Sequence, residues 1–121
     1  MQPEERDTAS LWDMLHALRT IGEYVRGKSY AEFEDDLLVQ DAVVRRLTIL
    51  GEAAVRLSPE RRRSLPGITW KTIIGMRNVV VHQYDKVILE RIWLTATEDV
   101  PQLEQVLAGV LASQPDPPLA G

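Results

Sequence analysis

The chain contains no cysteine, one phenylalanine and two histidines among its 121 residues. The absence of cysteine excludes a disulfide framework and any metal site built on thiolates. No uninterrupted apolar run approaches the roughly 18 residues that span a bilayer, and the charged start MQPEERD lacks the apolar segment of a signal peptide. We therefore expect a cytoplasmic protein without membrane contact.

Basic residues are outnumbered, because 14 Lys and Arg stand against 18 Asp and Glu, giving a net charge of -4. This balance argues against a general nucleic-acid coat protein, which needs many cationic contacts to phosphate, but it leaves a local site open. A hydrophobic fraction of 45% at this length is enough for one domain with its own core. We expect that domain to cover residues 1–112, followed by a disordered Pro-rich tail at 113–121.

Apolar residues recur at steps of three and four along most of the chain, which predicts helices rather than strands. The expected helices cover residues 10–26, a short stretch after 29, residues 39–57, a stretch from 70, and a last one from 85 that Pro101 must kink or interrupt. Helix starts are expected at Ser10 with Asp13, Ser29 with Glu32, Ser58 before Pro59, Thr69 and Asp85. Gly27 is expected to end the first helix. The prediction is an all-α, up-and-down bundle of about five helices.

The segment RNVVVHQY at 77–84 places Arg77, Asn78, His82 and Tyr84 around three valines. The valines allow a buried strand, but apolar residues at 70, 73, 74, 80 and 81 fit a helix better. Valine disfavours a helix by only a few tenths of a kcal/mol, which burial of an apolar face overrides. We therefore interpret the segment as part of a helix that begins at Trp70.

Arg77 falls on the apolar stripe of that helix, where its guanidinium needs an anion, carbonyl acceptors or a water-filled cleft. One interpretation is an internal ion pair with Glu52, which would also orient the guanidinium. Asn78 and His82 share a face, whereas Arg77 and His82 are about 140° apart on an ideal helix. Arg77 and His82 can converge only if the helix ends near His82 or a second copy packs across this surface.

The arrangement R-x-x-x-x-H-x-Y resembles the signature of the HEPN superfamily of metal-independent ribonucleases. In particular it resembles the HepT-like branch, the toxin member of the MntA/HepT toxin–antitoxin pairs. Four further blocks are similar to that branch in the same order: RDTASLWDML, LTILGEAA, LPGITWKTIIGMRN and DVPQL. The resemblance therefore extends over nearly the whole chain except the tail. The valine run, where relatives often carry Leu or Ile, leaves the polar residues unchanged.

The resemblance implies a HEPN-type homodimer in which Arg77 and His82 of both copies line one cleft. It also implies an RNA substrate, cleaved without metal or cofactor by attack of the ribose 2′-OH. For that reaction His82 would move protons, Arg77 would hold the phosphate oxygens, and Asn78 would orient the phosphate or the histidine.

The resemblance further implies a partner, a cognate MntA-like minimal nucleotidyltransferase that acts as the antitoxin. This partner transfers AMP onto the tyrosine of the motif, which is Tyr84 here. An adenylyl group beside Arg77 would add bulk and negative charge at the phosphate site. From the sequence alone, packing of the Tyr84 ring over the apolar stripe is the competing interpretation.

Other candidates fit structural roles better. We interpret the three arginines at 61–63 as a solvated face, and a contact with the RNA backbone by Arg61, Arg62 and Arg63 is the alternative. His16, three residues after Asp13, has no second ligand pair, so we expect no metal. Trp12, Trp70 and Trp93 fit core or dimer packing. The rival function for the whole chain is a catalytically silent helical protein-interaction module.

Overall fold

The computed structural model of the chain describes residues 2–76 and 85–114, and all regular structure in these ranges is helical. The elements are α1 (Pro3–Val25), α2 (Tyr30–Glu34), α3 (Leu37–Arg56), α4 (Pro59–Arg63), α5 (Trp70–Gly75), α6 (Lys86–Leu94), the π-helical segment η2 (Thr95–Asp99) and α7 (Val100–Leu111). The predicted all-α class is confirmed. The short helix α4 stands where the sequence predicted a turn capped by Ser58, and α6, η2 and α7 follow one another without a break.

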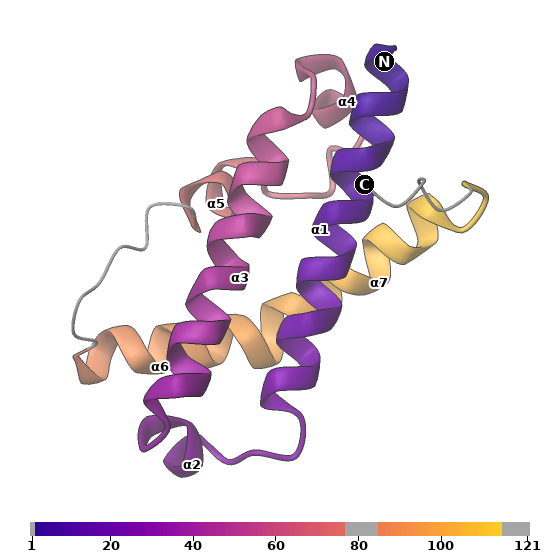
Figure 1. Cartoon of the computed structure of the whole chain (residues 1–121). Coiled ribbons are helices and arrows are strands. Elements are labelled where there is room, and N and C mark those ends of the chain that lie inside the picture. Colours follow the sequence, from indigo (N-terminus) through magenta and orange to yellow (C-terminus); the bar gives the residue numbers. More distant parts are fainter. Residues whose placement is uncertain (1, 77–84, 115–121) are drawn as a thin grey trace.

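Two long helices and one crossing helix build the domain. α1 and α3 lie side by side in opposite directions, and the uninterrupted succession of α6, η2 and α7 crosses behind both, with α7 at an angle to α6 (Figure 1). Leucines and valines from the facing sides of these helices form the core. The fully buried ones include Leu11, Leu15, Leu18, Val43, Leu50 and Leu107. Each such side chain contributes roughly 1.5–3 kcal/mol through burial. No helix in the described ranges is long and apolar enough to cross a bilayer.

The start of α1 differs from the prediction. The helix begins at Pro3, with Gln2 as N-cap, and Ser10 lies buried inside it instead of capping it. Proline is well suited to a first helical turn, and Glu4 and Glu5 stabilise the positive end of the helix dipole. Apolar periodicity begins only at Leu11, so the charged first two turns carried no signal of that kind.

The predicted ends between α1 and α3 are confirmed. Gly27 adopts φ 75°, a left-handed conformation that suits glycine and lets the chain leave α1. Ser29 and Glu32 form the expected capping box, in which the Glu32 N–H donates to Ser29 Oγ at 3.1 Å. The Ser29 N–H donates in return to Glu32 Oε1 at 2.9 Å. Local hydrogen bonding therefore fixes where α2 begins.

Pro101 marks an interruption of the last helix, as predicted, because a π-helical segment directly precedes it and α7 runs at an angle to α6 (Figure 1). It sits at the start of α7, directly after the π-helical segment Thr95–Asp99. A proline has no N–H and its ring crowds the carbonyl four residues earlier, and the wider π turn accommodates both defects. Thr97 also donates its hydroxyl to the carbonyl of Trp93 at 2.7 Å. The helix therefore changes direction at this point without ending.

The inner face predicted for the last helix is mostly confirmed. Ile92, Ala96 and Leu107 are buried, but Val106 is 47% exposed, so its assignment to the inner face was wrong. Val106 is rotated about 100° from Leu107, the next residue, which points to the core. It borders an open groove instead.

Candidate functional site

The segment RNVVVHQY lies outside the described residues. The predicted roles of Arg77, Asn78, His82 and Tyr84, and the course of the helix beyond Met76, therefore remain predictions. The structure does describe the two elements to which the segment is joined, and the surface of α3 that both of them contact. The helices α5 and α6, together with α3, therefore form the described surroundings of the candidate site.

On the upstream side, α5 is anchored by Trp70. Its ring N–H donates to the carbonyl of Arg62 at 3.0 Å and to that of Leu65 at 3.2 Å, which ties α5 to α4 and to the segment that follows α4. Ile73 is buried against the core, and Met76 caps the end of the helix. The predicted start at Trp70 is confirmed, although Thr69 caps it without a side-chain hydrogen bond.

On the downstream side, Asp85 caps α6 as predicted, because its Oδ1 accepts the Ile88 N–H at 2.8 Å. α6 packs against α2 and α3. Trp93 fixes this contact, since its ring lies 5.3 Å from that of Phe33 and 6.1 Å from that of Tyr30. Both ends of the candidate site are therefore held by tryptophans in structural positions, as the sequence suggested for these residues.

The phenol of Tyr30 belongs to this packing. Its oxygen is buried and has no hydrogen-bond partner among the described residues. Burial, and then the nearby carboxylates of Glu34 and Glu90, raise the pKa of Tyr30 above its ordinary value. A phenol that resists ionisation beside two acids is not suited to act as a general base.

An open groove of about 300 Å³ adjoins Met76. Its walls come from α1, α3, α5 and α7 and are largely apolar, with Leu18, Leu50 and Ile73 on them. Asp99 is the charged side chain of its described lining. An acidic, mostly apolar groove does not favour a phosphate, so the groove itself is a poor candidate for holding the RNA backbone.

Glu52 lies on the exposed face of α3, within the LTILGEAA block. It makes no ion pair with another side chain in the part of the chain that the structure describes. The pairing of Glu52 with Arg77 thus remains a prediction. On the same face of α3 lie Asp41 and Arg45, which the sequence analysis did not single out.

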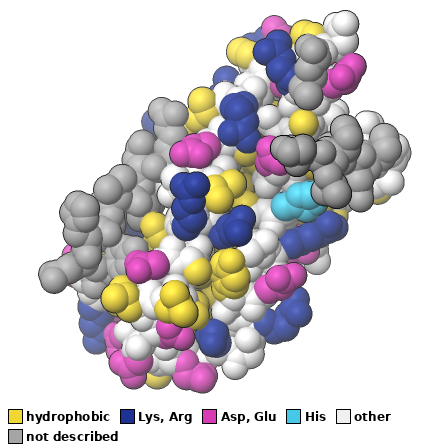
Figure 2. Space-filling model, in the orientation of Figure 1, with side chains coloured by type: hydrophobic (Ala, Val, Ile, Leu, Met, Phe, Trp, Pro, Cys, Tyr) yellow, Lys and Arg dark blue, Asp and Glu magenta, His cyan; other side chains and the backbone are white. Residues whose placement is uncertain are grey.

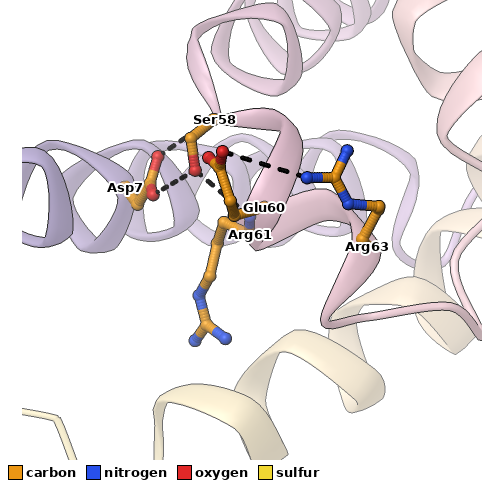
Figure 3. A network of polar contacts seen from close by, with 5 residues as sticks. All are labelled: Asp7, Ser58, Glu60, Arg61 and Arg63. Atoms are coloured by element: carbon orange, nitrogen blue, oxygen red, sulfur yellow. Dashed lines mark hydrogen bonds and ion pairs between the residues drawn. The ribbon is translucent and has the colours of Figure 1, made fainter.

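The three consecutive arginines form the last turn of α4. Arg63 lies 3.8 Å from Glu60, and Arg61 donates to the hydroxyl of Ser64 at 3.0 Å (Figure 3 shows the first of these contacts). Arg61 and Arg62 are partly buried, whereas Arg63 is exposed. Local contacts therefore engage two of the three guanidinium groups.

His16 and Asp13 do not act together. Asp13 accepts a hydrogen bond from Arg56 at 3.1 Å, and the His16 ring packs beside Trp12 at 5.9 Å between centroids. Within residues 2–76 and 85–114, no three His, Asp or Glu side chains gather as metal ligands would. Asp13 thus joins α1 to α3 through Arg56, whereas His16 contacts Trp12 on its own helix.

Sequence reasoning missed the contact between Asp7 and Ser58. The carboxylate of Asp7 is buried and accepts from the Ser58 N–H at 2.8 Å and from its hydroxyl at 2.7 Å. Ser58 Oγ in turn accepts the N–H of Arg61 as the α4 cap. The two residues are 51 positions apart, so no local pattern could pair them.

Residues 14–110 match the protein family described as "Ribonuclease HepT-like". A relative from Methanocaldococcus jannaschii, named "Putative RNase MJ1380", is 31% identical over 97 residues, covering 80% of this chain and 89% of its own. A relative from Caldanaerobacter subterraneus, "Putative RNase TTE0752", is 36% identical over 92 residues, covering 76% and 82%. The "Probable ribonuclease HepT" of Thermococcus cleftensis is 34% identical over 94 residues, covering 78% and 86%.

No solved structure gives a significant match to the chain. The matched range begins inside α1 and ends one residue before the end of α7. It includes the whole RNVVVHQY segment together with the helices that hold its two ends. On this evidence, the chain belongs to the HepT-like ribonuclease family, as the ordered blocks of its sequence indicated.

Proposed function

We propose that this chain is the toxin of a toxin–antitoxin pair and cleaves RNA internally without a metal ion. The observation that carries the proposal is the family match over residues 14–110, which includes Arg77, His82 and Tyr84. The relatives named as ribonucleases match 76–80% of this chain and 82–89% of their own length, so the likeness concerns whole domains.

In the proposed reaction, the ribose 2′-oxygen attacks the adjacent phosphorus while His82 accepts the 2′-hydroxyl proton. The bond from phosphorus to the 5′-oxygen breaks, and a second histidine, His82 of another copy, gives its proton to that leaving oxygen. The products are a 2′,3′-cyclic phosphate and a 5′-hydroxyl. Arg77 binds the non-bridging oxygens, where charge accumulates, and Asn78 orients the phosphate or the histidine.

Histidine suits both proton transfers because its ordinary pKa lies near neutrality. Arginine suits the phosphate because its planar guanidinium stays charged and can bind two oxygens at once. Each well-positioned acid or base contributes about 10²–10⁴-fold to the rate. A shared cleft supplies both histidines, which is why the proposal includes a homodimer.

The experiment is cleavage of a structured RNA by the purified chain in excess EDTA. We expect His82→Ala to lose at least about 100-fold in rate while keeping the helical circular dichroism of the wild type. His16→Ala is the matched control, because it removes the other histidine of the chain, which is exposed on α1. Equal loss in both variants, or unchanged cleavage by His82→Ala, would refute the assignment of His82.

A helical interaction module without catalysis is the second candidate. The net charge of -4 and the exposed side chains of Leu37 and Leu38 favour it, because they suit a protein partner better than a polyanion. The two candidates differ in one result: the module gives no cleavage of RNA at any enzyme concentration, with or without EDTA.

A further inference from the structure

The open groove beside Met76 lies between helices that pack on different partners. α5 packs on α3, whereas η2 and α7 pack on α1, so a gap remains between them over the line where α1 and α3 meet. The buried side chains of Leu18 and Leu50 form part of its floor. Its volume of about 300 Å³ is at the lower end of the roughly 300–1,000 Å³ that small-ligand sites occupy. The groove therefore fits one small group better than a helix or a strand of a partner.

Polar side chains lie on both walls of this groove. Thr69 and Thr72 come from the start of α5, and Asp99 and Gln102 come from the junction of η2 and α7. The members of each pair are three residues apart, so they lie close together on one side of their helix. The groove thus combines apolar surface with a few hydrogen-bonding groups, which is the usual composition of a site for a small organic group.

Two of these side chains occupy helix-cap positions without capping a helix. Thr69 precedes α5 and Asp99 precedes α7, and neither makes a side-chain cap hydrogen bond. For Asp99 the reason is that η2 runs directly into α7, so the first N–H groups of α7 can bond to the preceding turn. Within residues 2–76 and 85–114, Asp99 has no ion-pair partner either. Its carboxylate is therefore available to a ligand.

The carboxylate of Asp99 restricts which nucleobase the groove can bind, because an ionised carboxylate only accepts hydrogen bonds. Guanine has two adjacent donors on its Watson–Crick edge, N1–H and the N2 amino group, and both can donate to the two carboxylate oxygens. Adenine, cytosine and uracil each place an acceptor beside the donor on that edge, and this acceptor would repel the second oxygen. The amide of Gln102 and the hydroxyl of Thr72 can bind further polar atoms of the base.

We propose that the groove is a base-specificity site that binds an unpaired guanine of the RNA substrate, with Asp99 accepting from N1–H and from the N2 amino group. The inference rests on the proposed function and names a feature of its substrate. Unpaired bases of RNA are recognised by packing of side chains on their faces and by hydrogen bonds to their Watson–Crick edges. Met76 and Leu103, which are partly buried in the groove lining, supply apolar surface for the faces of the base.

The position of the groove supports this role. Met76 lines it and is the last described residue before RNVVVHQY, so the groove adjoins the segment that is proposed to bind phosphate. The groove itself would repel phosphate through Asp99, whereas an uncharged base avoids that repulsion. The face of α1 and α3 in Figure 2 carries side chains of both charges among apolar ones, so it offers RNA no uniformly basic surface. Base recognition in the groove would add the selectivity that this face does not supply.

The experiment measures binding of short oligouridines that carry one guanine, hypoxanthine or adenine at the centre. Their riboses carry 2′-fluoro groups, so the strands lack the proposed nucleophile and stay intact. Hypoxanthine is guanine without the N2 amino group, so it removes one of the two donors to Asp99. Fluorescence polarisation should show that the wild type binds the guanine strand at least about tenfold more tightly than either of the other strands.

The variant Asp99→Asn should bind the three strands within about threefold of one another, because the amide replaces one acceptor oxygen with a donor. Glu98→Gln is the matched control. It removes the neighbouring acidic charge, which is exposed and is not part of the groove lining, so it should keep the full preference for guanine. Both variants should keep the circular dichroism of the wild type, since the Asp99 side chain caps no helix.

Three results would overturn the proposal: equal affinity of the wild type for the three strands, tighter binding of the adenine strand, or a preference for guanine that Asp99→Asn retains. An arginine side chain of a protein partner is the competing occupant of the groove, and it predicts the first of these results. RNA cleavage is scored separately. Cleavage of all-ribose RNA without any preference for guanine refutes the base site and leaves the ribonuclease standing. A preference for guanine in binding that Asp99→Asn abolishes, without cleavage, does the reverse.

Discussion

Asp7 on α1 holds Ser58, the N-cap residue of α4, through both of its carboxylate oxygens. One oxygen accepts the Ser58 N–H at 2.8 Å and the other accepts its hydroxyl at 2.7 Å (Figure 3). The first turns of α1 and the junction between α3 and α4 are thereby joined at a position that is 92% buried on the Asp7 side. This contact therefore fixes the junction at which α3 ends and α4 begins.

Asp7→Ala should lower the free energy of unfolding by about 1–3 kcal/mol, because it leaves a partly buried N–H and hydroxyl of Ser58 without an acceptor. Urea unfolding followed by circular dichroism measures the change. The control is Asp13→Ala, which removes the exposed ion pair to Arg56 and should change stability by about 1 kcal/mol or less. Equal losses of unfolding free energy in the two variants would show that the Asp7 contact stabilises the fold no more than an exposed ion pair does.

Glu32 should make part of the stability depend on pH. The Ser29 N–H, and then its hydroxyl, hold the pKa of Glu32 below its ordinary value. Because the pKa of Glu32 is lower in the folded state, the contribution of its carboxylate to stability is complete above the pKa that Glu32 has in the unfolded chain. It is lost as the pH falls through the folded-state pKa.

The stability difference between the wild type and Glu32→Gln should therefore shrink as the pH is lowered from 7 into the acidic range. Thermal unfolding of both proteins at a series of pH values tests this, with Glu23→Gln on α1 as a control at an exposed site. A difference that stays constant across that range would mean that the charge of Glu32 plays no part in the cap.

The sequence predicted local features well because their causes are local. The Ser29–Glu32 capping box, the left-handed Gly27 and the Asp85 cap each depend on residues within a few positions of one another. The apolar periodicity of α3 similarly indicated its buried face. Such features can be inferred from a single chain.

The features that sequence reasoning missed arise from contacts between distant residues, or from the way in which a helix accommodates a proline. Asp7 and Ser58 meet only once α1 and α3 are packed. The π-helical form of the turn before Pro101 was not predicted either, because a proline indicates an interruption of the α-helical hydrogen bonds but not the geometry that accommodates it. For the candidate site, the sequence supplied the residue types and the family resemblance supplied their roles, and residues 77–84 lie outside the described part of the chain.

Tyr84 provides a test of the antitoxin proposal. Co-expression with a cognate nucleotidyltransferase of the kind that the resemblance implies should add one or more adenylyl groups to Tyr84 and abolish cleavage, because the added bulk and charge would obstruct the phosphate site. Tyr84→Phe should cleave RNA and escape this inhibition. Tyr24→Phe, on α1, is the control and should remain sensitive. Intact mass spectrometry that finds the same adduct on the Tyr84→Phe chain would return Tyr84 to a packing role.

The central claim is that the substrate's own 2′-hydroxyl is the nucleophile and that no metal ion takes part. Its most direct test uses two RNA oligonucleotides in excess EDTA, identical except for a 2′-deoxyribose at the scissile position. The wild-type chain should cut the all-ribose strand, leaving a 2′,3′-cyclic phosphate and a 5′-hydroxyl, and should leave the substituted strand intact at that position. Cleavage of the substituted strand there would require an activated water molecule and would contradict the mechanism.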